Sequence, residues 1–211
     1  MLEFKGVVDP ALFAEFCDAA DPAEFAAAAR WLKRARDVVV YGETPRLDIP
    51  LLGLSAWSER GVTRSRAWQL GYAVARAYRE LLAVGPMALV VPESLLTVRR
   101  ISAPSAGLEG LVVRQGDSCV GAVLPALPAR ARRFAAARAL GLTLLTTDRA
   151  ELLLDPAPTT LTKASRAFAA ELLAPAEGIW AYLAPLPAPT TSAFDAIAAR
   201  YRVDSSVVQH Q

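Results

Sequence analysis

The apolar positions of residues 63–82 recur at the spacing of one helix face. Leu70, Val74, Tyr78 and Leu81 follow one another at intervals of three or four positions, with polar and basic side chains among the positions between them. Such an apolar stripe is typical of an amphipathic helix that packs one side against a core. We therefore predict a helix over residues 63–82.

Two shorter helices are predicted ahead of this one. Each begins at an aspartate that is followed directly by proline, Asp9 and Asp21, and this pair is typical of a helix N-terminus. The second helix is expected to end near Arg36, because residues 38–41 are rich in valine and favour a strand. Residues 42–58 contain prolines and glycines and are expected to form a connector.

The periodicity changes in the middle of the chain. Residues 110–115 and 118–124 are rich in residues that favour strands, and the Gly-Asp pair at 116–117 between them predicts a hairpin turn. Residues 99–103 are a candidate third strand. A short helix is expected before it, over residues 92–98.

The last third of the chain is predicted to be helical again. A long helix is expected over residues 129–146, followed by a loop over 148–160 and a second helix over 161–173. A short helix is expected at 177–183. The final stretch, 192–211, has the pattern of a helix, a turn and a second helix.

These elements predict an α+β fold that is rich in helix and has a small sheet of about three strands, antiparallel or mixed. We expect two parts, a helical N-terminal extension over residues 1–60 and a domain over residues 61–211. The C-terminal helix pair at 192–211 would close the second part.

Composition limits the classes of protein that fit. The chain has 211 residues, of which 54% are hydrophobic and 21% charged, and a net charge of +2. No run of about 18 apolar residues is present, so no membrane partner is expected. The N-terminus lacks the basic and apolar regions of a signal peptide, and two unpaired cysteines fit a reducing compartment. We therefore expect a cytoplasmic protein.

The small numbers of histidine and cysteine exclude common kinds of site. The single histidine is His210, and the two cysteines, Cys17 and Cys119, are far apart in the sequence. A histidine-rich zinc site and a Cys-x-x-Cys redox motif are therefore excluded, and a Ser-His-Asp triad would need a histidine next to the end of the chain. Cys119 lies in a predicted strand and is expected to be a small core side chain.

Two stretches resemble a known family. Residues 132–142, RRFAAARALGL, resemble the active helix of the ImmA/IrrE family of zincin-like metallopeptidases, which typically reads RRFTLAHELGH. Residues 166–175, RAFAAELLAP, resemble the helix that follows in that family, NRFAAELLMP. Weaker similarity at 67–72 and 194–208 extends the resemblance over residues 63–211. It implies a zincin-like fold for this part of the chain.

The resemblance also implies which positions once held the metal. It places the first metal ligand at Arg138, the general base at Ala139, the second ligand at Leu142 and the third at Thr162. An arginine side chain cannot lose its proton to bind a metal, leucine has no lone pair, and alanine cannot accept a proton. We therefore expect a degenerate site with no metal, no cofactor and no catalytic residue.

Two polar residues remain as candidate contacts. Arg138 would place a fixed positive charge where the family keeps a dication, and could bind a carboxylate or phosphate of a partner. The favoured interpretation is a structural pairing of Arg138 with a nearby carboxylate, such as Asp148, Glu151 or Glu171. Glu171 is itself a candidate contact, although the family pattern favours a packing and capping role for it.

Three functions follow, of which we favour the first. Family members typically occur with phage repressors, toxin–antitoxin systems or stress regulators, so the resemblance implies a pseudopeptidase that binds a regulatory protein or peptide. The partner would add a strand at a sheet edge within residues 110–124. One alternative is a metal-free enzyme that uses Arg138 to orient an anionic substrate, for example in biosynthetic group transfer. Another is a DNA-binding regulator, which the absence of lysine and arginine after Arg202 disfavours.

Overall fold

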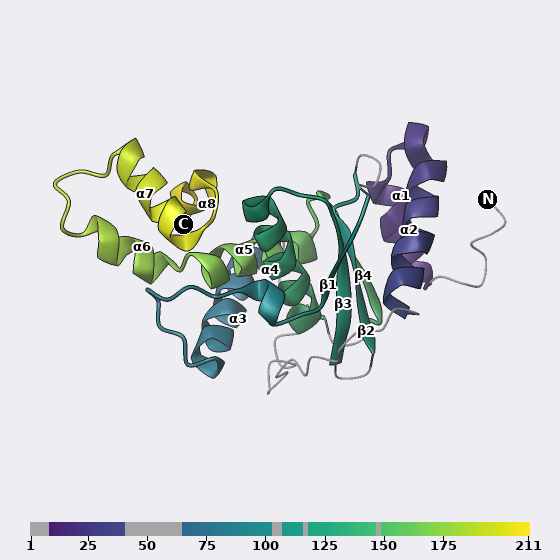
Figure 1. Ribbon diagram of the computed structural model, residues 1–211, viewed down its shortest axis with the longest axis horizontal. Helices are drawn as coiled ribbons and strands as arrows, with labels where there is room; N and C mark the ends of the chain where they lie inside the picture. Colours follow the sequence, from purple (N-terminus) through teal and green to yellow (C-terminus); the bar gives the residue numbers. More distant parts are fainter. Residues whose placement is uncertain (1–8, 41–64, 103–106, 116–117, 147–148) are drawn as a thin grey trace.

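The computed structural model describes residues 9–40, 65–102, 107–115, 118–146 and 149–211. These residues form eight α-helices and a four-stranded mixed sheet, an α+β fold as predicted. Figure 1 shows the sheet between two helical layers, with α1 and α2 on one face and α3, α4 and α5 on the other. Helices α6, α7 and α8 lie beyond the second layer, at the end of the molecule farthest from α1.

The first layer consists of α1 (Pro10–Ala19) and α2 (Phe25–Val40), joined through a 3-10 turn. Both predicted helix starts are confirmed. The carboxylate of Asp9 accepts a hydrogen bond from the backbone N–H of Ala11 at 2.9 Å, which satisfies a donor in the first turn of α1. Asp21 caps the 3-10 turn before α2 in the same way.

The prediction of a strand after Arg36 is wrong. Helix α2 continues through the valine-rich residues as far as Val40. Val39 is buried on the helix face that packs against the sheet, and this burial outweighs the strand preference of valine. The predicted connector at 42–58 lies outside the described residues.

The sheet contains β1 (Val98–Ile101), β2 (Gly110–Gln115), β3 (Ser118–Pro125) and β4 (Glu151–Leu154) in the order β1-β3-β2-β4. Strands β2 and β3 pair antiparallel, as the hairpin prediction requires, and β1 pairs parallel with β3. The expected docking edge at 110–124 is wrong, because β2 and β3 are the two central strands. The edges are β1 and β4.

Strand β4 pairs antiparallel with β2, in a region predicted to be a loop. All four of its residues are buried, so it lacks the alternation of polar and apolar positions that marks a strand with one exposed face. The helix predicted over 92–98 is also shorter than expected. It is a 3-10 turn, Pro92–Ser94, and Val98 already belongs to β1.

The second layer is built from α3 (Ala67–Leu81), α4 (Ala129–Leu145) and α5 (Thr160–Leu173). Two glycines let these helices approach closely. A Cβ atom at Gly71 of α3 would lie 2.2 Å from the carbonyl oxygen of Ala164 in α5, and one at Gly141 of α4 would lie 2.6 Å from the ring of Phe168. Close packing of α5 against both neighbours fixes where the side chains of α4 and α5 meet.

The C-terminal part consists of α6 (Ala176–Leu183), α7 (Thr191–Tyr201) and α8 (Ser205–Gln209). Tyr201 is buried, and its hydroxyl donates a hydrogen bond to the carbonyl oxygen of Pro86 at 3.0 Å. Arg202 turns the chain between α7 and α8 with a φ of 55°, in the left-handed region. The helix–turn–helix pattern predicted for the end of the chain is therefore present.

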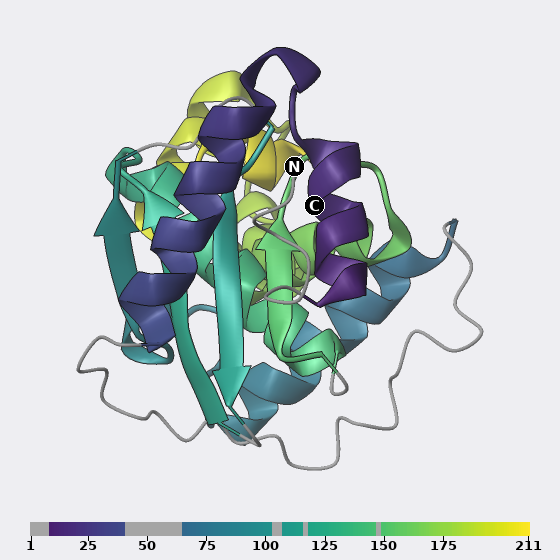
Figure 2. The ribbon, with the colours of Figure 1, turned by 90° about the vertical axis from the view of Figure 1, so that its right-hand side faces the viewer.

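Alternate residues of the sheet belong to two hydrophobic cores. Leu111 and Val113 of β2 face α1 and α2, whereas Val112 faces α4 and α5. Figure 2 shows α1 and α2 lying in front of this sheet face. The described part of the predicted N-terminal extension is thus a layer packed on the sheet. None of the described helices is long and apolar enough to cross a membrane.

Candidate functional site

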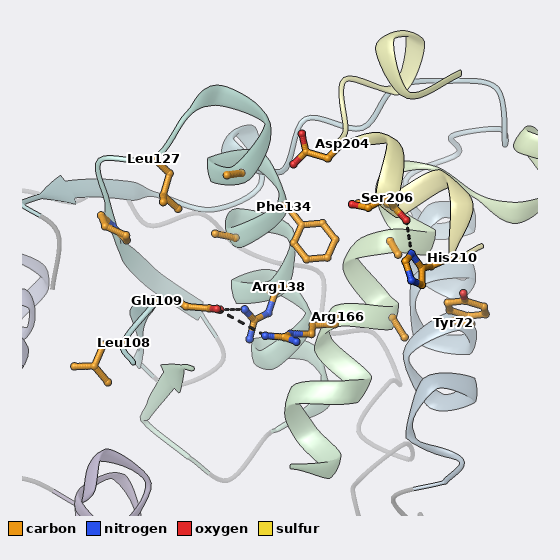
Figure 3. A pocket seen from close by; sticks show the side chains of 16 residues that line it. Tyr72, Leu108, Glu109, Leu127, Phe134, Arg138, Arg166, Asp204, Ser206 and His210 are labelled. Atoms are coloured by element: carbon orange, nitrogen blue, oxygen red, sulfur yellow. Dashed lines mark hydrogen bonds and ion pairs between the residues drawn. The ribbon is translucent and has the colours of Figure 1, made fainter. Parts of the chain in front are cut away.

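A cavity of about 700 Å³ lies between α4 and α5 and is bordered by α8. Its walls are mostly apolar, and its polar side chains are concentrated at two ends (Figure 3). The side chains that line it include Leu108, Glu109, Leu127, Phe134, Arg138, Arg166, Asp204, Ser206, Val207 and His210.

Arg138 lies at one end of the cavity, in the middle of α4, and is only 4% exposed. It forms an ion pair with the carboxylate of Glu109, and its second terminal nitrogen donates to the backbone oxygen of Asp155 at 2.8 Å. Burial is the largest influence on its pKa, followed by repulsion from Arg166, and together they lower this pKa to about 10. The guanidinium therefore remains positive at neutral pH.

Glu109 is shared between two arginines. Nη2 of Arg166 lies 3.7 Å from the second carboxylate oxygen of Glu109 (Figure 3). Glu109 directly precedes β2, and its backbone N–H donates to the carbonyl oxygen of Leu154 in β4 at 2.7 Å. Two guanidinium groups and one carboxylate thus leave an excess positive charge at this end of the cavity.

The expected pairing of Arg138 with a carboxylate is present, but the partner is a residue that the sequence did not suggest. Of the three predicted partners, Glu151 pairs with Arg36 at 2.6 Å and Glu171 pairs with a residue of α3. Asp148 lies outside the described residues. The sheet places Glu109 beside Arg138 because β2 is a central strand next to β4.

The other three positions that the resemblance predicts for a metal site are buried and do not line the cavity. Ala139 and Leu142 are buried in the core and do not line the cavity. Thr162 is buried at the start of α5, and its hydroxyl donates to Oδ1 of Asp155 at 3.5 Å. Arg138 and Thr162 therefore converge on one residue, Asp155.

Asp155 follows β4 and is itself buried. Burial raises the pKa of its carboxyl group, while a 2.7 Å hydrogen bond from the N–H of Ala157 and the charge of Arg138 lower it. Among the residues that the structure describes, no group of three or more His, Cys, Asp or Glu is arranged to hold a metal ion.

Glu171 lies outside the cavity lining and is almost fully buried. Its carboxylate accepts from Nε of Arg76 at 2.8 Å, from the backbone N–H of Ala176 at 3.1 Å and from the side-chain amide of Gln211 at 3.2 Å. These contacts tie α3, the start of α6 and the chain end to α5. They are consistent with the packing and capping role that the sequence favoured.

The other end of the cavity is formed by the C-terminal helix. Nδ1 of His210 contacts the backbone oxygen of Ser206 at 2.6 Å (Figure 3). Phe134, Leu127 and Val207 form apolar walls between the two ends. The arrangement suits binding of a segment that has an apolar group and a negative charge.

No protein-family model matches the sequence, and no curated protein matches it either. The interpretation of this site therefore depends on the residues themselves and on their geometry. Sequence reasoning found Arg138 and Thr162 but missed Glu109, Asp155 and the contact of Arg166. The position of Arg166, one turn after Thr162 on the same helix, was the available signal for the last of these.

Proposed function

We propose that the chain is a catalytically inactive pseudopeptidase of the ImmA/IrrE type that binds a segment of a regulatory protein in the cavity between α4 and α5. The observation that carries the proposal is the buried Arg138, held by Glu109 at the position that resembles a zinc ligand. A guanidinium in this place leaves no site for a cation, but it keeps a positive charge at the end of the cavity.

The shape and charge of the cavity favour a protein segment as the occupant. A volume of about 700 Å³ is sufficient for a few side chains, and the walls between its ends are apolar. Arg166 is partly exposed beside Glu109, so its guanidinium is accessible to a second carboxylate. The expected ligand is a segment with an apolar side chain next to a carboxylate.

The C-terminal helices support a protein partner over DNA. Helix α8 extends only over Ser205–Gln209, and Val208 is buried against the helical core. A recognition helix needs a longer exposed face with basic or amide side chains. No comparable observation favours the alternative of a metal-free enzyme.

The first experiment restores the residues of the family. The variant that combines Arg138→His, Ala139→Glu, Leu142→His and Thr162→Glu should bind about one zinc ion per chain, because three ligands then share one site. The wild-type protein should retain no stoichiometric zinc after gel filtration, measured by mass spectrometry of the metal. Stoichiometric zinc in the wild type, with casein cleavage that a chelator abolishes, would refute the proposal.

Two of these substitutions introduce polar groups into the core, so a smaller variant is needed. Arg138→His combined with Thr162→Glu leaves Ala139 and Leu142 unchanged and places two ligands at positions whose wild-type side chains contact Asp155, one at its backbone oxygen and one at its carboxylate. Cobalt(II) absorption would report a tetrahedral site. A variant that unfolds cooperatively in urea yet binds no metal would show that these positions do not form the predicted site.

The second experiment tests binding with a short peptide that ends in leucine, prepared with a free carboxylate and as the amide. The free acid should bind about tenfold more tightly, because only it can pair with Arg166. Arg166→Gln should remove the difference, and Arg34→Gln, which changes an exposed arginine of α2, should preserve it. Equal binding of acid and amide to the wild type would contradict the proposed mode of recognition.

A further inference from the structure

A second cavity, of about 340 Å³, lies at the start of α4 and is rich in arginine. Its charged lining consists of five arginines and one glutamate: Arg100, Arg130, Arg132, Arg133, Arg202 and Glu93. These residues come from β1, from the first two turns of α4, from the 3-10 turn before β1 and from the turn after α7. The fold therefore concentrates a net positive charge from distant parts of the sequence.

The backbone at this point is also favourable for an anion. Strands β1 and β3 run parallel and end here, and α4 follows β3 after a short connection. Binding sites in open sheets often lie at the carboxyl ends of parallel strands, beside the N-terminus of the next helix. Pro128 precedes α4 and provides no side-chain cap, and the first turn of α4 contains no acidic residue.

Arg133 lines this cavity and is only 6% exposed. One of its terminal nitrogens donates to the carbonyl oxygen of Val90, and its Nε is buried without a hydrogen-bond partner. Burial lowers its pKa, the charge of Glu93 opposes that effect, and Arg202 adds to it. Within the described part of the chain, none of the five arginines forms an ion pair.

This concentration of positive charge is unfavourable in the absence of a ligand. The N-terminus of a helix carries a partial positive charge, so Arg130, Arg132 and Arg133 lie where acidic residues would be stabilising. The arginines also repel one another, and Glu93 is the one carboxylate among the described lining residues. An anion with several oxygens would offset these costs, because the guanidinium fork matches phosphate oxygens.

We propose that this cavity binds a compact polyphosphate group, supplied either as inorganic pyrophosphate or as the terminal phosphates of a nucleotide. The concave shape favours such a group over a duplex, which needs an extended basic surface. Arg133 lines the cavity and has a buried Nε without a hydrogen-bond partner, and the lining residues Arg130 and Arg202 are exposed. The site is separate from the cavity at Arg138, so either proposal can fail without the other.

The test is calorimetric titration of the full chain with sodium pyrophosphate at low ionic strength, with ATP as the nucleotide source and sulfate at matched ionic strength as the reference. We expect pyrophosphate to bind with measurable affinity and sulfate to bind much more weakly. Combined substitution of Arg130→Gln and Arg202→Gln should weaken pyrophosphate binding about tenfold or more.

A matched control removes the same charge elsewhere. Arg30→Gln with Arg34→Gln changes two exposed arginines of α2, on the opposite side of the sheet, and should alter the affinity by less than about twofold. Glu93→Gln should tighten binding, because it removes a negative charge from the cavity lining. A rise in the thermal midpoint of the wild type with pyrophosphate would provide an independent measurement.

Four outcomes would overturn the proposal. They are binding of pyrophosphate and ATP no tighter than that of sulfate, equal weakening in the control variant, binding of ATP or pyrophosphate that the double variant does not weaken, and binding of a DNA duplex that depends on Arg130 and Arg202 while neither pyrophosphate nor ATP binds. The last result would assign these arginines to a nucleic-acid surface. Tight binding of both pyrophosphate and ATP, each lost in the double variant, would support the polyphosphate site.

Discussion

Helix α4 borders two cavities in which buried arginines have different partners. Arg138, in the middle of the helix, is 4% exposed and is held by the carboxylate of Glu109 and the backbone of Asp155. Arg133, near the start of the helix, is 6% exposed and donates to the backbone oxygen of Val90, its one acceptor among the residues that the structure describes. The exposed fractions of the two residues are therefore nearly the same, so residue exposure does not distinguish them.

The difference lies in charge compensation. A buried charge that has a carboxylate beside it is part of the folded structure, and removing the carboxylate should weaken the fold. A buried charge that lies among like charges and has no such partner lowers the stability of the folded protein. Removing charge from that cluster should therefore have the opposite effect, and three substitutions test this contrast.

The largest effect is expected for Glu109→Gln. It removes the carboxylate that pairs with the buried Arg138 and leaves the carboxyl group of Asp155 as the other acidic group near it, so the free energy of unfolding should fall by about 2–3 kcal/mol, less than for a fully buried pair because the Glu109 side chain is 37% exposed. Urea unfolding provides the measurement. Glu80→Gln, at an exposed position of α3, should change stability by less than about 0.5 kcal/mol. Equal losses in the two variants would show that the ion pair contributes nothing.

A smaller effect of opposite sign is expected for Arg130→Gln. Removing a positive charge from the first turn of α4 relieves repulsion by the helix dipole and by neighbouring arginines, so the free energy of unfolding should rise by about 0.3–1 kcal/mol. The gain should disappear at high salt, where such interactions are screened. Arg34→Gln on α2 is the control. A loss of stability in Arg130→Gln would mean that this side chain already has a stabilising role without a ligand.

The smallest effect is expected for Asp155→Asn, and it depends on pH. Burial raises the pKa of Asp155 above its ordinary value of 3.8, so the folded protein binds this proton more tightly than the unfolded chain. Stability from this group is then greatest at low pH and is lost as pH rises through the folded-state pKa. Asparagine keeps the oxygen that accepts from the N–H of Ala157. The free energy of unfolding of the variant, relative to that of the wild type, should therefore increase as the pH rises from about 4 to neutrality. Urea unfolding across this range would detect it, and a difference that does not change with pH would contradict the assignment.

The helices around both cavities could be predicted from the sequence. The predicted limits of α4 and α5 differ from the observed ones by one residue, because proline and capping residues mark their ends. The strand β4 could not be found in the same way, because its four buried residues have no alternating pattern. The strand predicted over residues 38–41 is wrong for 38–40, which belong to α2, because local preference gives no information about burial against the sheet.

The partners of the site residues depend on strand order, which local sequence patterns do not encode. Glu109 and Asp155 lie 46 positions apart by their residue numbers, and they become neighbours because β2 pairs with β4. The arginine-rich cavity could be predicted only in part from the sequence. Arg130, Arg132 and Arg133 are close in the sequence, whereas Arg100 and Arg202 join them only through the parallel pairing of β1 with β3 and the turn after α7.

The packing of α3 on α5 has a consequence for the synthesis of the protein on the ribosome. The ion pair between Arg76 and Glu171 joins residues 95 positions apart, so α3 is synthesised long before the helix that covers it. At about 5–20 residues per second, this interval lasts on the order of 5–20 s. During that time the apolar face of α3 cannot pack against α5. We therefore expect this segment to be a target for chaperones that bind nascent chains.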